Sequence, residues 1–199
     1  DEVEILDPKS TEERKIKNHY AELYWQDQKR KGVTEYEAKS VLRERNYFAS
    51  MMVKTGDADA MLSGYSRNYA SVVKPIMNII GKAKGVTRIA ATNLMLTDRG
   101  PLFLSDTSIN IDPTAKELAK IAHMNAQVVK LFGFKPVTAM LSYANFGAAT
   151  HPGAKKVTEA VAYLHRYYPD LDIDGPLQSD FALNKEMLAE KFPFSDLVK

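Results

Sequence analysis

The 199-residue chain contains no cysteine. Disulfides, thiolate zinc sites and a cysteine nucleophile are therefore excluded, and a reducing cytoplasm suits the chain. No apolar run approaches the ~20 residues that cross a membrane, and no basic segment followed by an apolar one opens the sequence as a signal peptide would. The motifs GxxxxGK, GxGxxG and GxSxG are also missing. The usual nucleotide-binding fingerprints are thus absent, and we expect a cytoplasmic location and no membrane partner.

The charge is nearly balanced. Lysine and arginine number 27 and aspartate and glutamate number 25, so the net charge of +2 carries no strong sign. Nucleic-acid-binding proteins usually carry a basic excess, and we therefore expect no nucleic-acid partner. Apolar residues make up 45% of the chain, as in ordinary globular proteins. The sequence predicts a globular fold that needs no disulfide to hold it.

The first part of the chain is predicted to be helical. Ile16, Tyr20, Leu23 and Tyr24 recur at the spacing of one helix face. Thr34 and Glu37 form the pattern of a capping box that opens a second short helix, and residues 47–54 make a third that ends at Gly56. Residues 58–63 are a short apolar run that we interpret as a buried strand. A polar turn and a further helix up to Gly81 follow. The lysines and arginines of this part are interpreted mainly as a solvated face.

From residue 89 onward the pattern changes to alternating strands and helices. Such an order predicts an α/β layer with a mostly parallel, mixed sheet, whose ligands lie beyond the carboxyl ends of the strands. Thr114 and Glu117 form a second capping-box pattern at the start of a helix. The expected strands are residues 89–96, 101–105, 137–141 and 171–173, and the last helix is expected at about 185–191.

The turn at residues 63–68 is the strongest candidate for a binding site. It joins a predicted strand to a predicted helix and contains two hydroxyls, Gly64, Arg67 and Asn68. Free amides at a helix start bind anions, and a guanidinium adds bidentate recognition of phosphate. The alternative is a polar connector in which serine or asparagine only caps the helix.

Histidines and carboxylates give weaker candidates. No two histidines are spaced as metal ligands on a helix, so a structural zinc site is not expected. His151 lies in a loop with glycine and proline and is the one histidine retained as a site candidate. Asp57 and Asp59 could pair on a metal, but a role in capping or in a turn is favoured.

Five spaced segments together resemble a known family, the phosphate acetyl/butyryltransferases. They are NYFASMMVK (46–54) with GDADAM (56–61), DPTA with ELA (112–119), AMLSY (139–143) and DGPLQ (174–178). The resemblance runs over essentially all 199 residues in the expected order. It implies a three-layer α/β fold with a mostly parallel mixed sheet, two-lobed with a cleft, of the isocitrate/isopropylmalate dehydrogenase-like phosphotransacetylase type.

Departures from the family pattern point to a subfamily. Phosphotransacetylases usually carry small residues and a Thr-Thr run where this chain has YSRNY (65–69), and a small-residue loop where it has ANFG (144–147). These variants, with FPFS at 192–195, are similar to the C-terminal domain of bacterial NADP-dependent malic enzymes. The resemblance then implies an oligomeric domain that senses acetyl-CoA, with NADP and a divalent metal (Mg or Mn) in a malic enzyme portion outside this sequence.

The sequence leads to one principal function and two alternatives. We expect two lobes, residues 1–83 and 84–199, in a segment of a longer protein. The longer protein is expected to decarboxylate malate to pyruvate. This domain is expected to bind acetyl-CoA, or another acyl-CoA or acyl phosphate, and to form a homo-oligomer. The family's catalytic Ser-Arg pair and Asp fall beyond the last residue, so no catalytic residue is assigned. A true phosphate acetyl/butyryltransferase and an assembly module without ligand are the alternatives. The expected ligand contacts are Ser63, Gly64, Arg67, Asn68, Ser142, Asn145 and Gly147.

Overall fold

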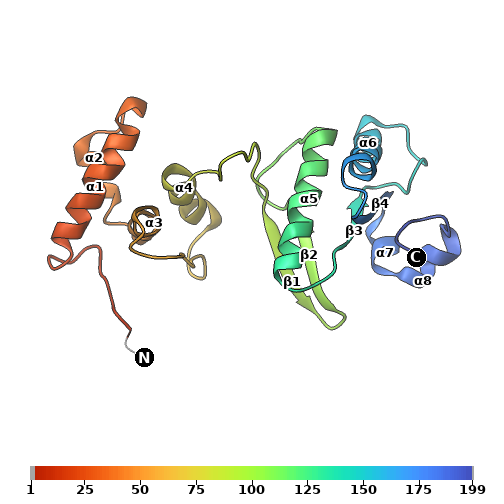
Figure 1. Cartoon of the computed structure of the whole chain (residues 1–199), viewed down its shortest axis with the longest axis horizontal. Helices are drawn as coiled ribbons and strands as arrows, with labels where there is room; N and C mark the ends of the chain where they lie inside the picture. Colours follow the sequence, from red (N-terminus) through yellow and green to blue (C-terminus); the bar gives the residue numbers. More distant parts are fainter. Residues whose placement is uncertain (1–2, 199) are drawn as a thin grey trace. The chain divides into compact units, whose positions relative to one another are not determined.

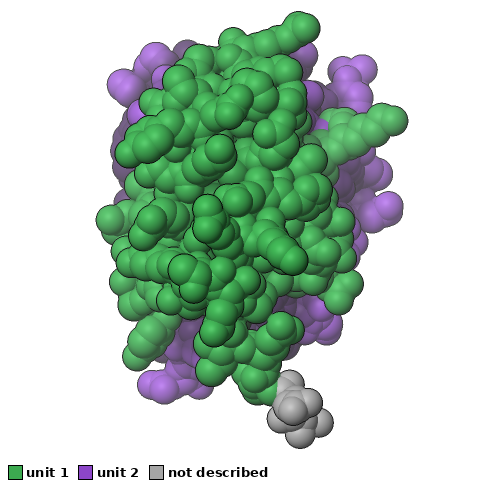
Figure 2. All heavy atoms as spheres, turned by 90° about the vertical axis from the view of Figure 1, so that its left-hand side faces the viewer, with its two compact units in different colours: residues 1–85 green, residues 86–199 purple. Residues whose placement is uncertain are grey.

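The computed structural model describes residues 3–198. The chain divides into two compact units, unit 1 (Asp1–Gly85) and unit 2 (Val86–Lys199), which are coloured separately in Figure 2.

Unit 1 is built from helices. Tyr20 and Met51 lie at the centre of its core, and Tyr20 packs edge-on against Phe48 with ring centroids 5.3 Å apart. The capping box predicted at Thr34 is confirmed. The Thr34 hydroxyl accepts a hydrogen bond from the Glu37 N–H, and the Glu37 carboxylate accepts one from the Thr34 N–H. The elements are α1 (Arg14–Gln28), the 3₁₀ turn η1 (Lys29–Lys31), α2 (Glu35–Val41), α3 (Arg45–Thr55) and α4 (Tyr69–Ile79).

The strand predicted at residues 58–63 is wrong. This segment has no strand partner and runs as irregular chain between α3 and α4 (Figure 1). Leu62, which a buried strand would cover, is fully exposed. A short apolar run becomes a strand only when a neighbouring strand takes up its backbone hydrogen bonds, and none of the described residues does so here.

Unit 2 combines helices with two small sheets. Figure 1 shows α5 lying across the hairpin of β1 and β2, where the Phe103 ring meets Phe132 with centroids 5.4 Å apart. A hydrophobic core joins α5 and α6 to β4 through Ala122, Leu164 and Ile173. The elements are β1 (Thr92–Thr97), β2 (Gly100–Ser105), α5 (Ala115–Leu131), β3 (Val137–Leu141), α6 (Pro152–Tyr167), β4 (Asp172–Leu177), α7 (Ser179–Leu183) and α8 (Lys185–Lys191).

The order of strands and helices up to β4 was predicted correctly. The sequence also predicts that residues 101–105 pair antiparallel with the strand before them, and this pairing is confirmed, whereas the expected single sheet is not found among residues 3–198. In the described residues β1 pairs only with β2, antiparallel, and β3 pairs only with β4, parallel. The protein is therefore α/β with two small sheets, and one continuous mixed sheet in three layers is not seen. Periodicity reports each strand's own faces, whereas the choice of neighbour depends on contacts distant in sequence.

The bounds of some strands and helices differ from those predicted. β1 begins at Thr92 rather than at residue 89, since the Ala91 N–H donates to the Asp106 carboxylate at 3.0 Å. β4 is longer than expected and reaches Leu177, and the short helix α7 was not predicted. The second capping box, Thr114 with Glu117, is confirmed at the start of α5.

Asp106 holds the loop that follows β2. Its carboxylate accepts backbone N–H bonds from Ala91, Ser108, Ile109 and Asn110, the last at 2.7 Å. Burial works to raise the pKa of Asp106, but hydrogen bonds from the backbone of Ala91, Ser108 and Asn110 and from the Asn110 side chain outweigh it and lower the pKa to about 2. The charged form of the carboxylate is thus favoured by the folded loop.

This depressed pKa makes stability depend on pH. Because the folded pKa lies below the ordinary 3.8, the contribution is present above about pH 4 and is lost as the pH falls toward 2. Asp106→Asn is expected to lower the free energy of unfolding at pH 7 by about 1–2 kcal/mol after allowance for solvent screening. Urea unfolding of both chains between pH 7 and pH 2.5 measures this difference. A difference that stays constant down to the lowest pH would contradict the assignment.

Candidate functional site

The loop at residues 63–68 is fixed to α3 by one buried amide. Asn46, at 2% exposure, accepts a hydrogen bond from the Ser63 hydroxyl at 2.8 Å through Oδ1. Its Nδ2 donates to the Ser71 carbonyl at 3.2 Å, in the first turn of α4. Arg45 adds a bond from Nη2 to the Ser66 hydroxyl at 3.0 Å. Both ends of the loop are therefore tied to the start of α3.

Two of the four predicted contacts in this loop serve the fold. Asn68 caps α4, because its Oδ1 accepts from the Ser71 N–H at 2.9 Å. The Ser63 hydroxyl is used by Asn46. Gly64 has φ +122°, a backbone conformation that favours glycine, and a Cβ there would meet open space. These positions shape the loop. Arg67 is its one charged residue, and its side chain has no hydrogen bond or ion pair among the contacts of residues 3–198.

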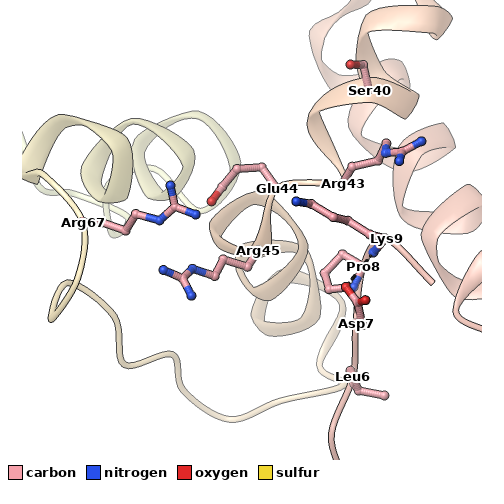
Figure 3. Close-up of a pocket in the computed structure, with 9 residues that line it drawn as sticks. All are labelled: Leu6, Asp7, Pro8, Lys9, Ser40, Arg43, Glu44, Arg45 and Arg67. Atoms are coloured by element: carbon pink, nitrogen blue, oxygen red, sulfur yellow. Dashed lines mark hydrogen bonds between the residues drawn. The ribbon is translucent and has the colours of Figure 1, made fainter.

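Arg67 lines a hollow of about 680 Å³ on unit 1, drawn in Figure 3. The N-terminal segment, the α2–α3 connection, the first turn of α3 and the 63–68 loop contribute to it. We call it the cationic hollow. Its lining residues are Leu6, Asp7, Pro8, Lys9, Ser40, Arg43, Glu44, Arg45 and Arg67.

Positive charge exceeds negative charge in the cationic hollow. Four of its side chains are cationic and two are carboxylates. Each carboxylate already accepts backbone hydrogen bonds: Glu44 caps α3 through the N–H groups of Asn46 and Tyr47, and Asp7 accepts from the Lys9 N–H at 2.9 Å. Within residues 3–198, none of the hollow's cations forms an ion pair. The arrangement is suited to an anion supplied from solution.

The other three predicted contacts lie in unit 2, after β3. Asn145 is paired with Gln178: its Nδ2 donates to Oε1 at 2.6 Å, and its Oδ1 accepts from the Gln178 N–H at 2.8 Å. The Ser142 N–H donates to the Leu177 carbonyl at 2.9 Å. Gly147 is exposed, with open space where a side chain would stand. This loop is thus fastened to the end of β4, while the Ser142 hydroxyl and Gly147 have no partner among the contacts of the described residues.

The loop after β3 also carries an aromatic cluster. The Phe146 ring lies 5.0 Å from Phe192 and 4.8 Å from Phe194. The Phe146 N–H donates to the Pro176 carbonyl at 2.6 Å, and φ at Phe146 is +47°. The Phe-Pro-Phe segment that marks the resemblance to malic enzymes therefore packs on the Asn-Phe-Gly segment that marks it too.

Two of the weaker candidates, His151 and Asp57, make contacts within the fold. His151 caps α6, with Nδ1 accepting from the Gly153 N–H at 3.1 Å. Asp57 accepts from the hydroxyls of Thr55 at 2.5 Å and Tyr20 at 2.6 Å. These two bonds lower the pKa of Asp57, Thr55 contributing most, and burial with the same carboxylate raises the pKa of Tyr20 to about 12. No group of three metal-ligating side chains occurs among residues 3–198, and none of the helices there has the length and apolarity needed to cross a membrane.

Three cations of the hollow were missed by sequence reasoning. Lys9, Arg43 and Arg45 were included in the solvated face of the helical part. Arg43 and Arg45 flank the capping Glu44, and that pattern was the available signal. Lys9 lies 58 positions before Arg67, since 67 − 9 = 58, and no local pattern links the two.

A fold of this kind, with its α/β unit and its helical unit, is found in the phosphotransacetylases. The family model for phosphate acetyl/butaryl transferase matches residues 1–199, so the chain belongs to that family. The resemblance drawn from the five sequence segments is confirmed.

Relatives of two kinds share this domain. The phosphate acetyltransferase of Synechocystis sp. is 35% identical over 193 residues, covering 97% of this chain and 27% of that protein. The NADP-dependent malic enzyme of Haemophilus influenzae is 39% identical over 180 residues, covering 90% and 23%. A phosphotransacetylase crystal structure from Streptococcus pyogenes is 36% identical with a TM-score of 0.76, covering 96% and 57%. This chain spans about a quarter of the two curated relatives and just over half of the solved structure.

Proposed function

We propose that this chain is the phosphotransacetylase-like domain of an NADP-dependent malic enzyme and that it binds acetyl-CoA or a related acyl ligand as a regulatory and oligomerisation module. The longer protein would convert malate to pyruvate, with NADP and the divalent metal held in its malic enzyme portion. The observation that carries the proposal is the Arg67 guanidinium, which lines the cationic hollow without an ion pair in the described part of the chain.

The chemistry of Arg67 suits an acyl carrier with phosphate groups. A guanidinium presents N–H donors in a planar fork that matches two phosphate oxygens. The loop that carries Arg67 is fastened at both ends by Asn46, and Asn68 at its end caps α4, so little conformational freedom is lost when a ligand binds. Regulation would follow if the ligand binds one quaternary state more tightly than another.

The proposal includes the finer fold of the family. We place lobes at residues 1–83 and 84–199 around a cleft, in a three-layer arrangement of the isocitrate/isopropylmalate dehydrogenase-like type. Leu96 on β1 and Val137 on β3 are exposed at 84% and 62%. Apolar residues on strands with one partner each support further strands or layers covering them in the complete protein.

Removal of the Arg67 charge tests the proposal. Arg67→Ala is expected to weaken acetyl-CoA binding about tenfold, because a hydrogen bond between charged groups is worth roughly 1.5–3 kcal/mol. Isothermal titration calorimetry on the full chain measures the dissociation constant. Arg99→Ala, which removes the same charge from the exposed β1–β2 turn, is the matched control and should bind as the unmodified chain does. Equal affinity of the Arg67→Ala chain would contradict the proposal.

A catalytic transferase is the second candidate. It is supported by the relatives and solved structures named phosphate acetyltransferase or phosphotransacetylase. In that case the complete protein would form acyl phosphate from acyl-CoA and phosphate, without malate. A coupled assay of acyl phosphate formation by the complete protein separates the regulatory domain from the transferase, and robust malate-independent turnover would favour the transferase.

The remaining alternative is an assembly module without a ligand. Light scattering with and without acetyl-CoA tests it, because the oligomer of such a module would not change in size when acetyl-CoA is added.

A further inference from the structure

We infer that the cationic hollow is a binding site for a ligand with at least two linked phosphate groups. The inference rests on the proposed function for the contact between Arg67 and an anion. It goes beyond that function by adding Lys9, Arg43 and Arg45 to the site and by naming the class of ligand.

The hollow is assembled from segments that are each held in place. Lys9 follows the buried Pro8, whose carbonyl accepts a hydrogen bond from the Lys17 ammonium at 2.8 Å. The Arg45 guanidinium is positioned by Ser66 at 3.0 Å. Figure 3 shows the Arg45 and Arg67 side chains on one side of the start of α3, Lys9 extending toward it from the N-terminal segment, and Arg43 directed to the other side. The positive charges are thus gathered by the fold and not by their order in the sequence.

The charge balance points to more than one phosphate. Four cations against two carboxylates leave two positive charges without compensation. Both carboxylates accept backbone N–H bonds, which restricts how far they can turn toward the cations. Like charges gathered in one hollow repel one another, and a ligand that relieves this repulsion carries several negative charges on one rigid group. A pyrophosphate or a multiply phosphorylated nucleotide meets this requirement.

The size and donor geometry agree with this class. A volume of about 680 Å³ lies within the range of roughly 300–1,000 Å³ that small-molecule sites occupy. It exceeds what a single phosphate ion fills. Three of the four cations are arginines, whose forked donors bind phosphate oxygens two at a time. The Ser40 hydroxyl, which also lines the hollow, is a further donor.

Pyrophosphate and phosphate are the direct probes. Titration of the full chain at low ionic strength is expected to show pyrophosphate binding at least about tenfold more tightly than phosphate, since each additional charged hydrogen bond contributes roughly 1.5–3 kcal/mol. Arg43→Ala should weaken pyrophosphate binding by about tenfold. Arg14→Ala removes an exposed arginine from the first turn of α1 in the same unit and should leave it unchanged. Equal affinity for the two anions, or an unaltered Arg43→Ala chain, would overturn the inference.

Competition identifies the source of the phosphates and separates this inference from the proposed function. Displacement of pyrophosphate by acetyl-CoA would assign the hollow to the phosphates of the acyl carrier, and simultaneous binding would assign it to a separate phosphorylated ligand; both support the site. Acetyl-CoA binding that depends on Arg67, with no pyrophosphate binding at all, would overturn the hollow and leave the proposed function standing. Pyrophosphate binding without acetyl-CoA binding would support the site in the hollow and overturn the proposed function.

Discussion

Gly175→Ala is expected to destabilise unit 2 by several kcal/mol and to prevent the native pairing of β3 with β4. A Cβ at this position would lie 2.5 Å from the Met140 carbonyl oxygen and 3.0 Å from the Met140 Cβ. The backbone oxygen belongs to the neighbouring strand and cannot turn away. The φ of +144° adds strain for any residue with a side chain. We expect a cost of about 4 kcal/mol or more, in the range of severe overpacking combined with backbone strain.

Hydrogen exchange measured by mass spectrometry on the full chain would test this result. Peptides from β3, β4 and α6 should lose protection in the Gly175→Ala chain. Gly133→Ala is the matched control, because Gly133 also has a positive φ, +81°, but has open space where a Cβ would stand. That variant should cost only about 1–2 kcal/mol, the penalty of the left-handed conformation. Similar effects of the two substitutions would show that the contact with Met140 is not decisive.

The second large effect is expected at Asp174. This carboxylate is 8% exposed and accepts three hydrogen bonds: from the Gly175 N–H at 2.8 Å, the Ser195 hydroxyl at 2.8 Å and the Asp196 N–H at 2.9 Å. It joins the end of the chain to β4. Asp174→Ala leaves all three donors without this acceptor. Two of them, the Gly175 N–H and the Ser195 hydroxyl, belong to buried residues, and each buried unpaired group costs roughly 1–3 kcal/mol. We expect a loss of about 3 kcal/mol or more in the free energy of unfolding.

Urea unfolding followed by far-ultraviolet circular dichroism measures this loss. Ser195→Ala is the graded control, since it removes one of the three bonds to the carboxylate and keeps that carboxylate satisfied by two backbone N–H groups. It also removes the weaker bond that the Ser195 hydroxyl accepts from the Leu197 N–H at 3.3 Å. Its cost should be about 1 kcal/mol. If Asp174→Ala were no more harmful than Ser195→Ala, the segment around Ser195 would be held by other contacts.

Local signals predicted local structure well. The two capping boxes, at Thr34 and Thr114, formed as expected because the partners of each are three residues apart and need no other part of the chain. Strand β3 and helix α8 were predicted with the bounds that the structure shows. Each of these rests on a pattern complete within one element.

The failures share a different cause. Residues 58–63 have the composition of a strand but no partner, and β1 through β4 form two small sheets in the described residues instead of one. Whether an apolar run becomes a strand, and which strand it joins, depends on residues far away in the chain. The five spaced segments identified the family, but they did not show that the strands form two separate sheets.

The candidate site divides in the same way. Arg67 was predicted and lines the hollow. In the same turn, Ser63 fastens the loop to Asn46, and Asn68 caps α4. A hydroxyl or amide in a turn has the same sequence signal whether it binds a ligand or the backbone. Lys9 and Arg43 joined the site through the tertiary fold.

The sequence by itself determined the family, the helices with their caps, and the presence of a guanidinium after a polar turn, because these depend on the residue types and on spacings of a few positions. Only the tertiary structure decided that the strands form two sheets and which turn residues bond within the fold. It also decided that Lys9 and Arg67, which are distant in the sequence, line one hollow. Residues distant in the sequence become neighbours through packing of the core, and the presence of a charged residue does not indicate which distant residues will lie beside it.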